Sequence, residues 1–135
     1  MVRIISGVLV GFVSWLVAWV GIEKILSALW PAFGVHQAAF QNAITEGGEF
    51  TADATMLITH IVMGSVVSIM SGAVAALIAG GNSRAPLFVG IMLLALGLLK
   101  AAMSWPHVPV WYHVLFTAML LPMAILGGRL IAPSQ

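Results

Sequence analysis

Charged residues divide the chain into four long apolar stretches joined by polar connections. The helices predicted from this pattern cover residues 4–29, 54–79, 86–104 and 109–128. About 20 helical residues cross the roughly 30 Å hydrocarbon core of a bilayer, so each stretch is long enough to span a membrane. Pro31 limits the first helix, and Pro86 and Pro109 fall in first turns, where a missing N–H is tolerated.

Residues 31–53 form the only long connection. Within it Phe33, Phe40 and Ile44 recur at helical spacing between polar residues, which predicts a short interfacial helix lying on the outer leaflet. Asp53 directly precedes the second span. We expect it to cap that helix, because aspartate accepts hydrogen bonds from the free N–H groups of a first turn.

Composition supports a membrane protein and excludes several other classes. Of the 135 residues, 61% are apolar and only 7% are charged, whereas about a quarter are charged in soluble domains. The net charge of +1 provides no field for nucleic acid, and the absence of cysteine excludes disulfides and thiolate-bound metals. The sequence therefore predicts an all-α integral membrane protein, with residues 1–135 forming one up-down bundle of four transmembrane helices plus the short outer interfacial helix.

The charges also predict an orientation. Three arginines fall on one side of the membrane in a four-span path: Arg3, Arg84 and Arg129. The acidic residues fall on the other side: Glu23, Glu46, Glu49 and Asp53. Because basic residues accumulate on the cytoplasmic side, we expect both termini in the cytoplasm.

Small residues at regular spacing predict where the helices pack, because helices in lipid associate through close backbone approach. The predicted packing positions of the first span are Gly7, Gly11, Ser14, Ala18 and Gly21, and those of the second are Gly64, Ser68, Gly72 and Ala76. A four-residue row turns gradually about its helix, so the second row can contact two neighbours. These rows either pack the monomer or also dock another subunit. Pro122 is expected to kink the fourth span.

Two histidines within the spans are candidate ligands. We expect His60 and His113 to lie at similar depth in the outer half, on helices that are diagonal partners in an up-down bundle. Neutral imidazole is a good iron ligand, so the pair could hold a haem b, or a quinone, between them. Alternatively, each histidine is satisfied by a threonine, a backbone carbonyl or Glu23. The sequence offers no catalytic constellation and no further metal site.

Lys100 is the charged residue inside a span, and three roles are open for it. Its ammonium can reach up to the interface, pair with Glu23 as an intramembrane ion pair, or belong to a proton or ion pathway. Trp15 and Trp19, four residues apart, either pack in the bundle or stack on a quinone, pigment or lipid tail. No special role is predicted for His36.

The second half of the chain contains several short motifs. They are G-A-V-A-A-L-I-A-G at 72–80, Arg84, Gly90, P-H-V-P-V-W at 106–111, Pro122 and Gly127-Gly128-Arg129-Leu130, together with Glu23 in the first half. In these residues the chain resembles a family of small four-span bacterial inner-membrane proteins of unknown function. The resemblance implies the fold and an inner-membrane location, but no activity. Two departures are Val108, which separates the histidine from the second proline, and Lys100, where the family tends to have asparagine. Gly21-Ile22-Glu23-Lys24 alone resembles DoxX-like proteins.

The function predicted from these features is that of a non-enzymatic accessory subunit or stabiliser of a larger membrane complex. The chain has almost no mass outside the membrane, and it carries long rows of small residues. The alternative is a small cofactor protein that holds haem b or quinone with His60 and His113. A weaker alternative is an oligomeric transporter or channel. The expected partners are the bilayer with bound lipid, and other membrane subunits or further copies of this chain, but no nucleic acid.

Overall fold

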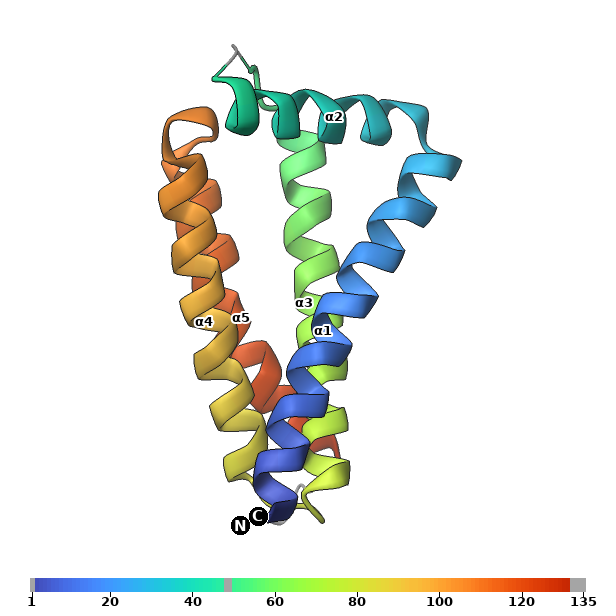
Figure 1. The fold of residues 1–135 in the computed structure, drawn as a ribbon, viewed down its shortest axis with the longest axis vertical. Helices are drawn as coiled ribbons and strands as arrows, with labels where there is room; N and C mark the ends of the chain where they lie inside the picture. The colour runs from blue at the N-terminus through green and yellow to red at the C-terminus, as the bar shows by residue number, and fades with distance from the viewer. Residues whose placement is uncertain (1, 48–49, 132–135) are drawn as a thin grey trace.

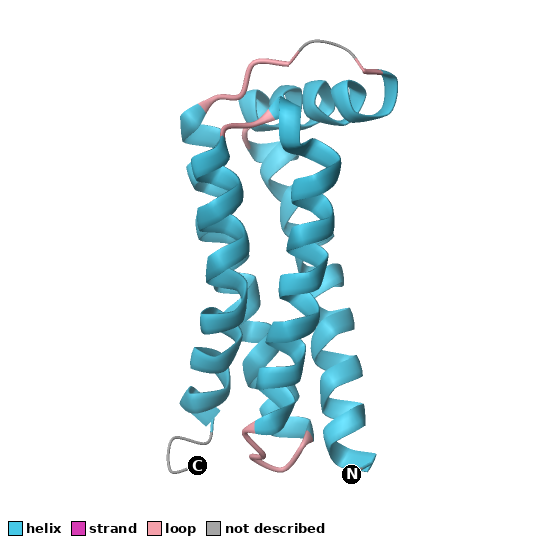
Figure 2. Cartoon of the chain, turned by 90° about the vertical axis from the view of Figure 1, so that its left-hand side faces the viewer, coloured by secondary structure: helices cyan, strands magenta, loops and turns pink. Residues whose placement is uncertain are grey.

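The computed structural model describes residues 2–47 and 50–131, and within these ranges it contains helices and short connections but no strands (Figure 2). Four helices are long and apolar enough to cross a membrane. They are α1 (Val2–Leu29), α3 (Ala54–Ile78), α4 (Arg84–Ser104) and α5 (Val110–Ile131). A short 3-10 helix, η1 (Trp105–His107), joins α4 to α5. The predicted all-α membrane bundle is confirmed.

The remaining α-helix, α2 (Pro31–Glu46), lies across one end of the bundle, and both termini lie at the opposite end (Figure 1). We call these the α2 end and the terminal end. The helix begins with Pro31 in its first turn and ends at Gly47, whose φ of 73° is a left-handed conformation that glycine adopts at low cost. Asp53 then caps α3, as predicted, by accepting hydrogen bonds from the backbone N–H groups of Thr55 and Met56 at 2.8 and 3.3 Å.

The order of helices around the bundle differs from the expectation. The second and fourth spans, α3 and α5, are not diagonal but form the most extensive helix pair. The reason is close backbone approach at the terminal end: a Cβ added to Gly72 would overlap the carbonyl of Ala124, and one added to Gly127 would overlap the carbonyl of Ile69. Because Gly127 packs in this way, α5 does not end at the Gly127-Gly128 pair but continues to Ile131.

The predicted packing positions of α1 divide into two groups. Gly7 and Gly11 are buried against Ala75 and Ser71 of α3, and the Ser71 hydroxyl donates a hydrogen bond to the Gly11 carbonyl at 2.6 Å. Ser14 and Ala18 instead border a shallow groove on the outer surface of the bundle. Gly21 faces open space. Above Gly11 the positions that face the bundle interior are occupied by Trp15 and Trp19, which are both buried.

The small-residue row of α3 contacts two neighbours. Gly64 packs against Phe116 of α5, and Gly72 packs against the α5 backbone. Between them, the Ser68 hydroxyl accepts a hydrogen bond from the Trp15 indole of α1 at 3.0 Å. Ala76 is buried lower on the same helix. The turning row therefore joins α1 and α5 to a common central helix.

The helices diverge toward the α2 end. In Figure 1, α1 lies against the other helices at the terminal end and leans away from α4 as it approaches α2, which bridges the gap across the top. At the terminal end α1 and α4 meet where Gly11 packs against Val89. At the α2 end large rings pack in the interior and hold the helices farther apart, among them Phe33 of α2 and Phe116 of α5. This change from glycine to aromatic packing leaves the space in which the candidate site lies.

Candidate binding cavity

A cavity of about 290 Å³ lies beneath α2, between the diverging helices. All four long helices and α2 contribute to its wall, which is mainly apolar and aromatic. Its polar members come from all four spans and from α2: Glu23 of α1, His60 of α3, Lys100 of α4, Tyr112 of α5, and His36, Gln37 and Gln41 of α2. The cavity thus collects ionisable side chains that are far apart in the sequence.

The aromatic wall is built around two tryptophans of α1. The rings of Trp15 and Trp19 stack in parallel, with centroids 5.2 Å apart and planes at 6°. Phe116 of α5 meets Trp19 edge to face at 5.6 Å. The hydrogen bond from Trp15 to Ser68 fixes this stack against α3. The two indoles therefore turn into the bundle, where they form a flat, rigid side of the cavity.

Lys100 places its ammonium group inside the bundle. The Nζ atom lies 4.9 Å from the ring centroids of both Trp19 and Phe116, a distance typical of cation–π interactions. Glu23 lines the same cavity, and its carboxylate accepts a hydrogen bond from Gln37 of α2 at 2.9 Å. Within the described residues no ion pair of 4.0 Å or less joins Lys100 to Glu23. The two charges therefore share one space without direct contact.

His60 occupies the top of the α3 row and is buried. Its Nδ1 atom lies 2.7 Å from the Met56 carbonyl oxygen, which can only accept, so Nδ1 carries a proton and donates. The ring stacks on Phe33 at 5.0 Å and tilts against Trp19 at 5.9 Å. The nitrogen that remains for a ligand is Nε2.

His113 lies in a different environment. Its ring stacks flat on Trp105 of η1 at 4.9 Å, and its Nε2 atom is buried without a hydrogen-bond partner. It is not among the residues that line the cavity, whereas His60 is. No group of three or more metal-ligating side chains occurs in the described part of the chain. Haem binding by this pair stays a prediction. Of the two predicted ligands, His60 lines the cavity and His113 does not.

His36 is a site residue that the sequence analysis did not single out. Its Nε2 accepts a hydrogen bond from the backbone N–H of Asp53 at 3.2 Å, and its Nδ1 is buried without a partner. Burial lowers the pKa of His36 below its ordinary value of 6.5, while the Asp53 carboxylate opposes this shift. The signal was present in the sequence, since Phe33, His36 and Phe40 fall on one face of a helix.

The cavity opens sideways between α1 and α4. Leu99 and Met103 of α4 line it, yet their side chains are 58% and 60% exposed on the outside of the bundle. The α2 residues Phe40 and Ile44 cover it from the end of the bundle. These exposed residues place an opening of the cavity on the outer surface of the bundle beside α4, and Gln41 of α2, which also lines the cavity, is exposed as well.

The fold and the cavity together define a four-span helical membrane protein with a covered internal pocket that opens laterally. Comparisons with protein-family models, with curated proteins and with solved structures found no match to this chain. The resemblance to small four-span bacterial inner-membrane proteins therefore stays a prediction from sequence motifs.

Proposed function

We propose that this protein binds a small lipophilic molecule, taken from the bilayer, in the cavity beneath α2. The observation that carries the proposal is the combination of three features in one cavity. They are an aromatic wall, the single ammonium group of Lys100, and an opening on the outer surface of the bundle at Leu99. A ligand that fills such a space gains dispersion contacts that an empty cavity lacks. A lateral opening favours entry from the membrane over entry from water.

The proposed role is binding without catalysis. Two of the other polar groups in the cavity already have partners: Glu23 accepts from Gln37, and His60 donates to Met56. Nucleophilic catalysis instead needs a nucleophile and a base within hydrogen-bonding reach of each other. The arrangement suits a carrier, store or sensor of a membrane-dissolved molecule.

The test is to identify what the purified protein retains. We would purify wild-type protein in mild detergent and analyse the extracted small molecules by mass spectrometry, beside Leu96→Trp and Leu98→Trp. Leu96 lines the cavity, whereas the neighbouring Leu98 is 58% exposed on the outer surface. Because the larger ring at position 96 fills the space, we expect that variant to lose a molecule that wild type and Leu98→Trp both retain. Equal retention in all three, or no retained molecule beyond bulk phospholipid, would contradict the proposal.

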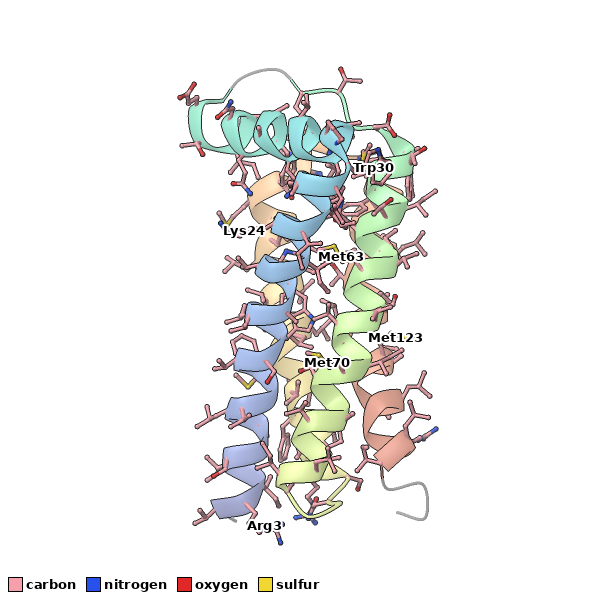
Figure 3. The ribbon with its side chains drawn as sticks, turned by 90° about the vertical axis from the view of Figure 1, so that its right-hand side faces the viewer. Arg3, Lys24, Trp30, Met63, Met70 and Met123 are labelled. Atoms are coloured by element: carbon pink, nitrogen blue, oxygen red, sulfur yellow. The ribbon has the colours of Figure 1, made fainter. Side chains whose placement is uncertain are left out.

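We further propose that the protein resides in a bacterial inner membrane with both termini in the cytoplasm. Arg3 lies at the terminal end and Lys24 toward the α2 end (Figure 3). Arg84 begins α4 and Arg129 lies in the last turn of α5, so the arginines gather at the terminal end. Asp53 caps α3 at the α2 end, as the orientation predicted from charge requires. Glu49 lies outside the described residues.

This orientation can be tested by labelling, because the chain has no cysteine. Thr45→Cys and Ser83→Cys place single thiols at exposed positions of the α2 end and the terminal end. A membrane-impermeant maleimide applied to spheroplasts is expected to label position 45 and not position 83. Labelling of position 83 alone would reverse the orientation.

A role as accessory subunit is a second candidate. Ser14 and Ala18, with Met70 of α3, border a shallow groove on the outer surface, and Gly21 leaves open space next to it. Small residues on an outer face allow another helix to approach closely. Co-migration with a larger complex on a native gel, lost in Ala18→Trp, would support this role. A monomer in every detergent tested would count against it.

A further inference from the structure

The charged hydrogen-bond donor of the cavity, the Lys100 ammonium, has no hydrogen-bond acceptor among the described residues. The Lys100 ammonium carries three N–H donors, and its contacts in the described structure are the ring faces of Trp19 and Phe116. Ring faces attract a cation but do not replace the acceptor oxygens that it loses on leaving water. A ligand that brings an oxygen to Nζ would complete this site.

The charge balance of the cavity selects the kind of oxygen. The charged groups that line it are the Lys100 ammonium and the Glu23 carboxylate, which sum to zero. The facing imidazole of His36 is neutral when its Nε2 accepts from the Asp53 N–H. A carboxylate or phosphate ligand would add a second anion beside Glu23 in a space with little water to screen it. A neutral carbonyl oxygen accepts from Lys100 without adding charge.

The shape of the cavity selects a flat molecule. In the parallel Trp15–Trp19 stack each indole covers one face of the other, so the planar surface that remains for a ligand is an outer ring face of the pair. The volume of about 290 Å³ lies at the lower end of the range for ligand pockets, which is room for a substituted ring but not for a whole amphipathic lipid. The opening between Leu99 and α1 lets an alkyl tail remain in the bilayer.

We infer that the ligand is a neutral conjugated ring with a carbonyl group, of the quinone class, whose carbonyl oxygen accepts a hydrogen bond from Lys100. The ring lies along the Trp15–Trp19 stack, and its tail leaves through the side opening. This inference rests on the proposed function and adds the ligand class and the residue that recognises it. It transfers the quinone from the predicted His60–His113 pair to Lys100 and the tryptophans.

The test uses decylubiquinone as the probe and protein reconstituted in phospholipid nanodiscs. Quenching of tryptophan fluorescence measures binding to wild type, Lys100→Met and the matched control Lys24→Met, whose lysine is exposed on α1. Methionine keeps the length of the side chain but removes the donor. Loss of a hydrogen bond from a charged donor is expected to weaken binding about ten- to a hundredfold, with no change in the Lys24 control. Equal saturable quenching in Lys100→Met would overturn the role of this lysine.

A second measurement does not depend on any variant. Decylubiquinone labelled with ¹³C at its carbonyls is expected to show a lowered carbonyl stretching frequency in wild-type nanodiscs relative to empty ones. A frequency identical to that in lipid would contradict the hydrogen bond.

Palmitate in the same nanodiscs separates this inference from the proposed function. Displacement of the retained molecule by palmitate, with no saturable binding of decylubiquinone, would overturn the quinone class and leave the cavity as a binding site. If neither probe binds and purified protein retains no molecule, both proposals fail.

Discussion

The two halves of the bundle are built from different residues and pack differently. At the terminal end, glycine, alanine and serine bring backbones into contact, as at Gly72 against Ala124 and Gly11 against Ser71. At the α2 end, the stacked Trp15 and Trp19 and their neighbours hold the helices apart. One membrane bundle thus contains a closed half that fixes its geometry and an open half that leaves a cavity. The comparison shows that side-chain size along the same helices decides which half contains a cavity.

The largest expected effect comes from disturbing the closed half. In Gly72→Ala the new methyl group overlaps the Ala124 carbonyl, so α3 and α5 must separate. We expect a loss of about 3 kcal/mol in the free energy of unfolding, measured by thermal denaturation in detergent. The matched control is Gly21→Ala, which meets no neighbour and is expected to change stability by less than about 1 kcal/mol. Equal effects of the two substitutions would contradict the division into halves.

A smaller effect is expected where α3 begins at the α2 end. Asp53→Ala removes the acceptor for the Thr55 and Met56 N–H groups and is expected to cost about 1 kcal/mol. Amide hydrogen exchange in the first turn of α3 should rise in this variant. Asp53→Asn keeps an acceptor oxygen and should retain most of the protection. If the alanine variant exchanges like wild type, the cap does not stabilise the helix end.

A single hydrogen bond in the closed half is expected to contribute less. Ser71→Ala removes the bond to the Gly11 carbonyl and should cost about 0.6 kcal/mol, the average for hydrogen bonds between membrane helices. Ser65→Ala is the control, since its hydroxyl bonds only to Ile61 within its own helix. Unfolding by titration with sodium dodecyl sulfate can resolve this difference in the free energy of unfolding. A larger effect at position 65 would show that α1 and α3 do not depend on this contact.

The smallest effect is local and depends on pH. His36 holds the Asp53 N–H only when its Nε2 is unprotonated, and burial lowers its pKa when α2 is docked. The contact is therefore complete above pH 6.5 and is lost as the pH falls through the lowered pKa. After correction for intrinsic rates, exchange of α2 amides should increase as the pH falls from 6.5 through this lowered pKa. In His36→Gln, which has an acceptor that does not titrate, this increase should disappear, and its persistence would exclude His36 as the cause.

Much of the fold followed from simple patterns in the sequence. Charge spacing predicted the four long helices, and the Phe33–Phe40 spacing predicted α2. The Asp53 cap is local chemistry and was also predicted. The order of helices was not, because contact between α3 and α5 depends on which glycines of two distant segments face each other, as Gly72 and Gly127 do.

The site was harder to predict than the fold for a related reason. Glu23, His60 and Lys100 were recognised as polar groups within the spans, but the sequence does not state that they share one cavity. No special role was predicted for His36, because its role depends on how α2 folds back over the bundle. Side-chain type along one helix is local information, whereas a cavity is formed by the angle between helices.

The most direct test of the account compares distances between helices α1 and α4 at the two ends. Spin labels on Lys24→Cys and Met103→Cys report on the opening of the cavity, and labels on Ile5→Cys and Phe88→Cys report on the closed half; all four positions are exposed. Double electron–electron resonance is expected to give a broad distribution of label-to-label distances at the opening, and this distribution narrows on addition of decylubiquinone. The distribution at the closed half should be narrow and unchanged. Two narrow distributions that do not respond to the quinone would contradict the account.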